Sequence, residues 1–189
     1  MTTRRNFNFK IALTSASAVL ALVASSHLTL AQAQTTMSKP VKIIVGFPPG
    51  GSADAVARLL ANQLGNAQSA AYAPTVIVDN KPGAGGRIGA QTVKAGEADG
   101  SQFLLTPASI LTIYPHVYKK LGYDSLADFT PVSTVASVTF AFSVSSAVPA
   151  SVKTIADYVV WAKANPNQAN FGSPAAGATP HFVGVMFGR

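Results

Sequence analysis

Apolar residues recur in two different periods along this chain, and the two periods alternate. Residues 41–47, 75–80 and 102–106 form short, mainly apolar runs, and the first, V-K-I-I-V-G-F, is typical of a strand buried on both faces of a sheet. Apolar residues at helical spacing predict a helix that begins at Ser52 and a shorter one over 88–95. Strands that alternate with helices predict an α/β fold.

The character of the chain changes near Pro131, beyond one or two helical turns expected within 107–121. Thr154, with Asp157 three residues later, forms a capping box and predicts the start of a helix. That helix should end at Asn165, because a residue before a proline avoids the helical region. The remaining expectations are two apolar runs within 132–144, a short strand over 170–173, a loop S-P-A-A-G-A-T-P and the start of a helix over 181–187.

The first 33 residues have the order of a secretory signal peptide. Arg4, Arg5 and Lys10 precede an apolar stretch over 11–30, and Ala31-Gln32-Ala33 is a small-x-small cleavage site. A transmembrane anchor is the alternative, but the serine and threonine residues of the stretch make it a poor spanning helix. Thr3-Arg4-Arg5-Asn6-Phe7 also hints at twin-arginine export. We therefore expect a periplasmic protein without a stable membrane anchor after cleavage.

The composition of the chain excludes or disfavours several classes of function. Without residues 1–33, 156 of the 189 residues remain, with 11 basic against 7 acidic side chains and a net charge of +4. The basic residues are scattered, apart from Lys119-Lys120, so nothing suggests a nucleic-acid partner. The absence of cysteine excludes disulfides and thiolate metal sites, and the histidines lack metal-site spacing. We expect no cofactor and no metal.

The stretch 41–58 carries the clearest chemistry. It has a buried strand, a turn F-P-P-G-G and a helix with Ser52 as its expected N-cap and Asp54 in its first turn. The N–H groups at such a helix start lack intrahelical partners and attract anions. A plain strand–helix turn, with glycines for geometry only, is the alternative. The turn lacks the phosphate-loop and dinucleotide-binding patterns, and no serine lies in G-x-S-x-G, which disfavours an anion-binding hydrolase or transferase.

Four segments in order resemble one known family. They are F-P-P-G-G-S-A-D-A-V-A-R (47–58), V-D-N-K-P-G-A-G-G-R-I-G-A (78–90), Y-D-S-L-A-D-F-T-P-V (123–132) and F-G-S-P-A-A-G-A-T-P-H-F (171–182). Together they are similar to the Bug family, the TctC-like periplasmic receptors of tripartite tricarboxylate transporters. The resemblance runs from about Pro40 to the last residue.

The resemblance implies a periplasmic-binding-protein fold of type II, a flytrap of two α/β lobes around a cleft. It implies a receptor, not an enzyme, for a small carboxylate such as a dicarboxylate, a citrate-like acid or an aromatic acid. The partner would be a membrane permease or a sensor protein. The expected division is a signal peptide over 1–33, lobe 1 over 34–136 and the start of lobe 2 over 137–189.

The resemblance also assigns residues to the site. Backbone N–H groups of the first loop and of a second loop, residues 173–181, would bind the carboxylate, with Asp54 holding the first loop. The ligand-binding candidates are Phe47, Gly50, Gly51, Ser52, Asp54, Ser109, Ser173, Gly177, Ala178, Thr179 and His181, and a further set is Gly85, Gly86 and Arg87.

Two departures from the family pattern stand out. Arg87 replaces a position that is usually asparagine, and E-A-D-G-S (97–101) replaces the usual P-D-G-Y-T. Family members are about twice as long, which leads us to expect a chain truncated within its second lobe. A non-functional remnant of such a receptor is therefore the main alternative.

Overall fold

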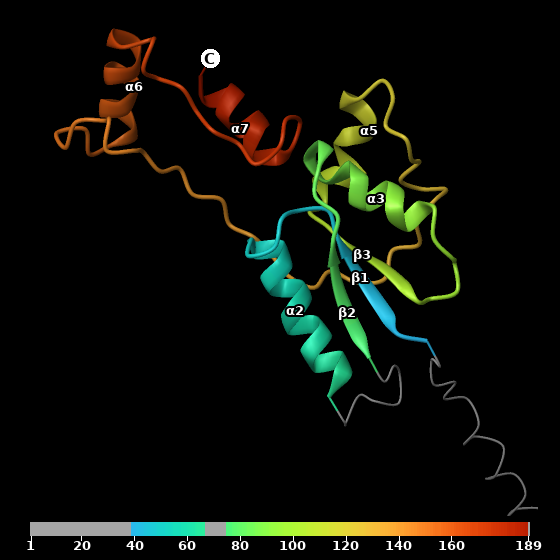
Figure 1. The fold of residues 1–189 in the computed structure, drawn as a ribbon. Helices are drawn as coiled ribbons and strands as arrows, with labels where there is room; N and C mark the ends of the chain where they lie inside the picture. The colour runs from blue at the N-terminus through green and yellow to red at the C-terminus, as the bar shows by residue number, and fades with distance from the viewer. Residues whose placement is uncertain (1–38, 67–74, 189) are drawn as a thin grey trace, which may run out of the picture.

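A three-stranded parallel sheet forms the core of one half of the computed structural model, which describes residues 39–66 and 75–188 (Figure 1). Its strands are β1 (Val41–Val45), β2 (Val76–Asn80) and β3 (Gln102–Leu105), in the order β2-β1-β3. All three predicted strands are confirmed. The first ends at Val45 and not at residue 47, because its partners also end there, at Asn80 and Leu105.

The central strand is covered on both faces, as its apolar sequence predicts. Ile43 and Val45 pack with Ala57 of α2 (Ser52–Gly65), which covers one face. Ile44 points to the opposite face and is 1% exposed. There α3 (Arg87–Lys94) lies against β1 and β3. Burial on both faces explains why this strand reads as a continuous apolar run.

Three short helical elements complete this half of the molecule. They are η1 (Ala84–Gly86), α4 (Ser109–Thr112) and α5 (Tyr114–Val117), so the helical turns expected within 107–121 are confirmed. Ile110 and Tyr114 form a second apolar cluster with Ala90 and Tyr123, and Leu104 of β3 packs against it. The Tyr123 hydroxyl donates to the Ile110 carbonyl at 2.6 Å.

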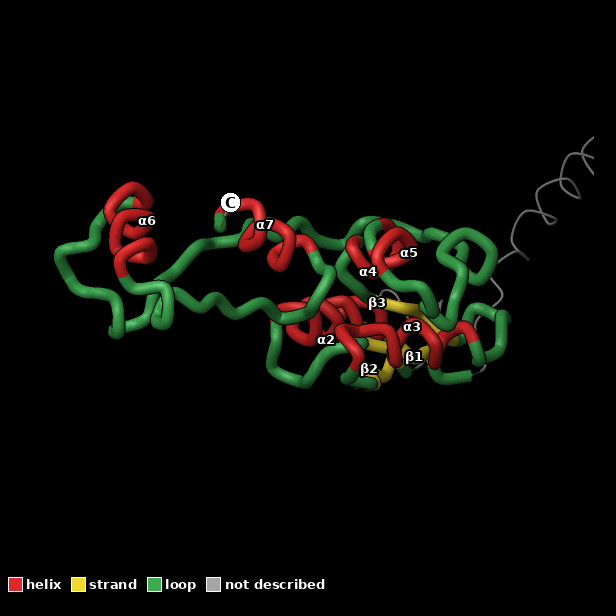
Figure 2. Tube along the Cα trace, turned by 90° about the horizontal axis from the view of Figure 1, so that it is seen from above, coloured by secondary structure: helices red, strands yellow, loops and turns green. Residues whose placement is uncertain are grey.

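Beyond Pro131 the chain extends away from the half of the molecule that contains the sheet (Figure 2). Residues 131–144 have no regular structure and are exposed, and they lead to α6 (Ile155–Ala164) at the end of the molecule far from the sheet (Figure 2). The expected capping box is present, since Thr154 accepts from the Asp157 N–H at 3.1 Å and Asp157 accepts from the Thr154 N–H at 3.0 Å. The proposed lobe boundary at residue 136 falls within the extended segment and stays a prediction.

Two expectations for the last part of the chain need correction. The strand over 170–173 is wrong, because no neighbouring strand among the described residues pairs with it. The final helix, α7 (Thr179–Phe187), starts two residues before His181, since Pro180 fits the first turn of a helix. The signal peptide expected over 1–33 lies outside the described residues. None of the helices in the described ranges is long and apolar enough to cross a membrane.

Candidate functional site

The loop between β1 and α2 presents a row of backbone N–H groups at the carboxyl edge of the sheet. Gly50 adopts a left-handed conformation, with φ of 86°, and Gly51 is the N-cap of α2. Ser52 is the first helical residue, not the expected cap, and its hydroxyl makes no capping bond. Among the described residues, the N–H groups of Gly51, Ser52 and Ala53 have no acceptor. These are the orphan donors of a 14-residue helix.

The side chain of Asp54 is 3% exposed and holds this loop in place through hydrogen bonds. Its Oδ2 accepts from the Gly50 N–H and from Arg58 Nε, both at 2.9 Å. Its Oδ1 accepts from Asn80 Nδ2 at 3.0 Å. The bond from Arg58, reinforced by those from Gly50 and Asn80, lowers the pKa of the Asp54 carboxyl to about 2, against the opposing effect of desolvation. The Gly50 N–H is therefore bonded within the protein in this structure, and its assignment as a ligand donor stays a prediction.

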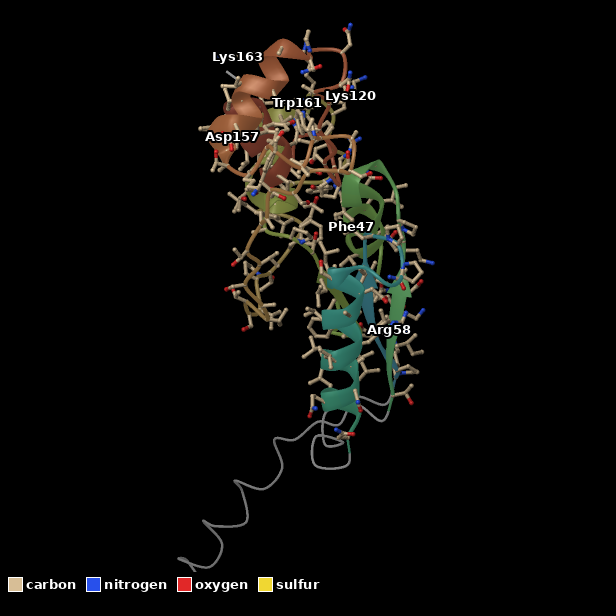
Figure 3. The ribbon with its side chains drawn as sticks, turned by 90° about the vertical axis from the view of Figure 1, so that its left-hand side faces the viewer. Phe47, Arg58, Lys120, Asp157, Trp161 and Lys163 are labelled. Atoms are coloured by element: carbon tan, nitrogen blue, oxygen red, sulfur yellow. The ribbon has the colours of Figure 1, made fainter. Side chains whose placement is uncertain are left out.

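Two residues that support the loop were absent from the sequence-based candidates. Arg58 lies one helical turn after Asp54, and this i,i+4 spacing of opposite charges could have revealed it. Asn80 ends β2, beside β1, and also donates to the Phe47 carbonyl at 3.1 Å. Its place at the carboxyl end of a neighbouring strand was the available signal. Figure 3 shows Phe47 beyond the N-terminal end of α2 and Arg58 along that helix.

The glycine-rich loop after β2 forms the next part of the site. Gly86, with φ of 92°, contacts the Phe47 ring and the Ile110 side chain. The first loop therefore packs against the glycine-rich loop through Phe47. The Gly85 carbonyl accepts from the Tyr114 hydroxyl at 3.0 Å. The Arg87 guanidinium lies 4.0 Å above the centre of the Tyr118 ring. The cationic side chain of Arg87 thus stacks on a tyrosine.

Two residues follow β3 at the same edge of the sheet. Ser109, a candidate, is 6% exposed at the start of α4. Thr106 was not a candidate, yet its Oγ1 is buried and has no hydrogen-bond partner among the described residues. Its position directly after a strand could have identified it.

The second loop, residues 173–181, uses some of its expected donors internally. The Gly177 N–H donates to His181 Nδ1 at 3.2 Å, and the Ala178 N–H donates to the Ala175 carbonyl at 3.3 Å. Both N–H groups are therefore bonded within the loop in this structure, and the assignment of Gly177 and Ala178 to the ligand stays a prediction. The N–H groups of Thr179 and His181 have no acceptor within the described part of the chain. The Ser173 hydroxyl is bonded to the Ala175 carbonyl at 3.3 Å.

The structure joins these pieces through the glycine-rich loop. Gly86 contacts Phe47 of the first loop, and Gly85 packs beside Ala175 of the second. A separate open hollow of about 190 Å³, lined by Phe142, Tyr158 and neighbouring residues, contains none of the candidate residues. Within the described ranges, no group of three or more metal-ligating side chains gathers anywhere. The geometry therefore offers backbone N–H donors for an anion.

Known proteins are similar to this chain in sequence and in fold. The family model of the tripartite tricarboxylate transporter family receptor matches residues 56–188, which is more than half of the chain. The chain belongs to this receptor family. Its resemblance to the Bug and TctC-like receptors is therefore confirmed.

Individual members of the receptor family share about a third of their aligned residues with this chain. Identity is 34% to the UPF0065 protein in the gbd 5'region of Cupriavidus necator, over 95% of this chain and 52% of that protein. It is 33% to BugT of Bordetella pertussis, over 82% of this chain and 46% of that protein. The structure of R. palustris Rpa4515 with adipate matches with a TM-score of 0.67 and 33% identity, over 75% of this chain and 46% of that one.

These comparisons confirm the expected α/β fold of the periplasmic-binding-protein type. The chain spans about half the length of the curated relatives it matches.

Proposed function

We propose that this chain serves in a periplasmic receptor that binds a small carboxylate and hands it to the permease of a tripartite tricarboxylate-type transporter, or to a sensor protein. The observation that carries this proposal is the row of N–H groups at Gly51, Ser52 and Ala53, which have no acceptor in the part of the chain that the structure describes. Hydrogen bonds from such groups to a carboxylate are charge-assisted and about twice as strong as neutral ones.

The electrostatics of the first loop favour an anion there. Asp54 is the acidic side chain of the first turn of α2, and its charge is offset by the ion pair with Arg58 at 2.9 Å. The positive end of the α2 dipole therefore remains available to a ligand. The second loop adds the free N–H groups of Thr179 and His181 at the start of α7.

Membership of the receptor family and the adipate found with R. palustris Rpa4515 support a dicarboxylate as the first ligand to test. We propose binding without chemical turnover, because the site contains hydrogen-bond donors but no paired nucleophile and base among the described candidates. The periplasmic location rests on the family and on the expected signal peptide.

The N–H groups can be tested one at a time, because proline is tolerated at the first position of a helix. Ser52 is exposed and occupies that position in α2, and Gly51 before it is already extended, with φ of −79° and ψ of 171°, as a residue before proline must be. Ser52→Pro therefore removes one free N–H without disturbing the helix. Ser52→Ala is the matched control, because it removes the hydroxyl and keeps the N–H.

Binding of adipate, citrate and benzoate to the full chain would be measured by calorimetry. We expect one of these acids to bind, and Ser52→Pro to weaken its binding by about 10- to 100-fold, since a hydrogen bond to a charged group contributes about 1.5–3 kcal/mol. Ser52→Ala should bind as the wild type does. Absence of binding by the wild type, or equal binding by Ser52→Pro, would refute the proposal.

A further inference from the structure

The second loop is the one part of residues 131–188 that is buried. Ala175 is 6% exposed and Ala178 is 7% exposed, and Gly177 between them is buried too, whereas α6 and α7 contain no buried residue. Both alanines pack into the cluster built on Ile110 and Tyr114. The second loop therefore packs against the half of the molecule that contains the sheet, and residues of that half must determine the position of the loop.

Tyr118 makes the polar connection to this loop. Its hydroxyl donates to the Ala176 carbonyl at 2.8 Å across 58 residues of sequence. Its ring packs edge-on against Tyr114, with the centroids 4.9 Å apart. Tyr114 in turn donates to the Gly85 carbonyl. Two neighbouring tyrosines thus hold one carbonyl in each of two glycine-containing loops.

Arg87 holds Tyr118 in this position. Its guanidinium carbon lies 4.0 Å above the ring centre, within the range of a cation–π interaction, and its Nε donates to the Ala84 carbonyl at 2.9 Å. The Arg87 guanidinium therefore covers one face of the Tyr118 ring, and the hydroxyl of the same ring bonds the second loop.

We infer that Arg87 and Tyr118 are positioning residues that orient the second loop for ligand binding. By holding the Ala176 carbonyl, Tyr118 determines where the left-handed turn at Gly177 lies, with its φ of 78°. This turn leads directly into α7, whose first N–H groups are free. The consequence for the ligand rests on the proposed function, but the effect on the loop does not.

Hydrogen exchange of the full chain without ligand tests the effect on the loop. Tyr118→Phe keeps the ring and removes the bond to Ala176, and Arg87→Gln removes the cation. Each should accelerate exchange in a peptide spanning 174–182 by about 3- to 10-fold, as expected for one neutral hydrogen bond, and leave the strands unchanged. Tyr123→Phe is the matched control. It also removes a tyrosine hydroxyl from this apolar cluster, but that hydroxyl bonds the Ile110 carbonyl and not the second loop. Unchanged exchange of the loop in Tyr118→Phe would overturn the inference.

Titration with adipate, well below the melting temperature, tests the effect on binding. Kd should rise by about the same factor for Tyr118→Phe and Arg87→Gln, and Arg87→Lys, which keeps a cation, should restore part of the loss. A looser loop with unchanged Kd would overturn the positioning role. If the wild-type chain binds no carboxylate, the proposed function fails, and the exchange data alone still decide whether these residues hold the loop.

Discussion

Gly46 connects β1 to the first loop, and replacing it by alanine should disturb both stability and the site. A Cβ on Gly46 would lie 2.6 Å from the carbonyl oxygen of Gly86 and 2.8 Å from its Cα. In the other direction, a Cβ on Gly89 would lie 2.7 Å from the Gly46 Cα. All these neighbours are backbone atoms, so no side-chain rotation relieves the contact.

The size of the effect follows from this geometry. Ordinary van der Waals contact begins at 3.4 Å, so the backbones of Gly46 and Gly86 must separate by about 0.8 Å. Overpacking of this kind costs about 1–3 kcal/mol of the free energy of unfolding. For a chain of this length, each kcal/mol shifts the melting temperature by about 2–4 °C, so Gly46→Ala should melt about 2–12 °C below the wild type.

Thermal and urea denaturation, followed by circular dichroism, measure this loss. Gly172→Ala is the control, because its added Cβ would meet nothing within 4 Å, and it should melt at or slightly above the wild-type temperature. Since Gly46 and Gly89 share one contact, the double variant should lose at least about 0.5 kcal/mol less than the sum of the single losses. A Gly46→Ala variant that melts like Gly172→Ala would refute the reasoning.

Three further predictions concern separate features. The pKa of Asp54 is about 2 in the folded chain, against an ordinary value of 3.8. The ionised Asp54 carboxylate therefore stabilises the fold fully above about pH 5, and this stabilisation is lost as the pH falls toward 2. Thermal melts at pH 7, 5 and 3 should show a smaller loss of stability on acidification for Asp54→Asn than for the wild type. Thr154→Ala should cost about 1 kcal/mol in urea denaturation, because it removes an N-cap, and Thr154→Ser, which keeps the hydroxyl, should restore most of it. Ile110→Val should cost about 0.5–1.5 kcal/mol at a site that is 1% exposed, and an equal cost for the exposed Ile88→Val would contradict the packing described here.

Much of the fold could be predicted because its signals are local. The apolar run of β1 identified a strand covered on both faces. The Thr154 and Asp157 pair identified the start of α6, since both halves of a capping box lie within four residues. The order of four motifs identified the receptor family.

The strand expected over 170–173 was wrong because a strand exists only where another strand pairs with it, and pairing is not a local property. For the same reason the apolar runs within 132–144 did not determine a structure of their own. Valines and phenylalanines there are exposed, although their sequence is apolar.

By itself, the sequence determined the three strands, the starts of α2 and α6, and the two loops rich in backbone N–H groups. The tertiary structure decided which of those N–H groups are free. The Gly50 and Gly177 N–H groups are engaged by side chains only four residues away, those of Asp54 and His181, but the Asp54 carboxylate is itself held by Asn80, which ends the neighbouring strand β2. A backbone donor is available to a ligand only when no other group lies within hydrogen-bonding distance, and that distance depends on how separate segments pack.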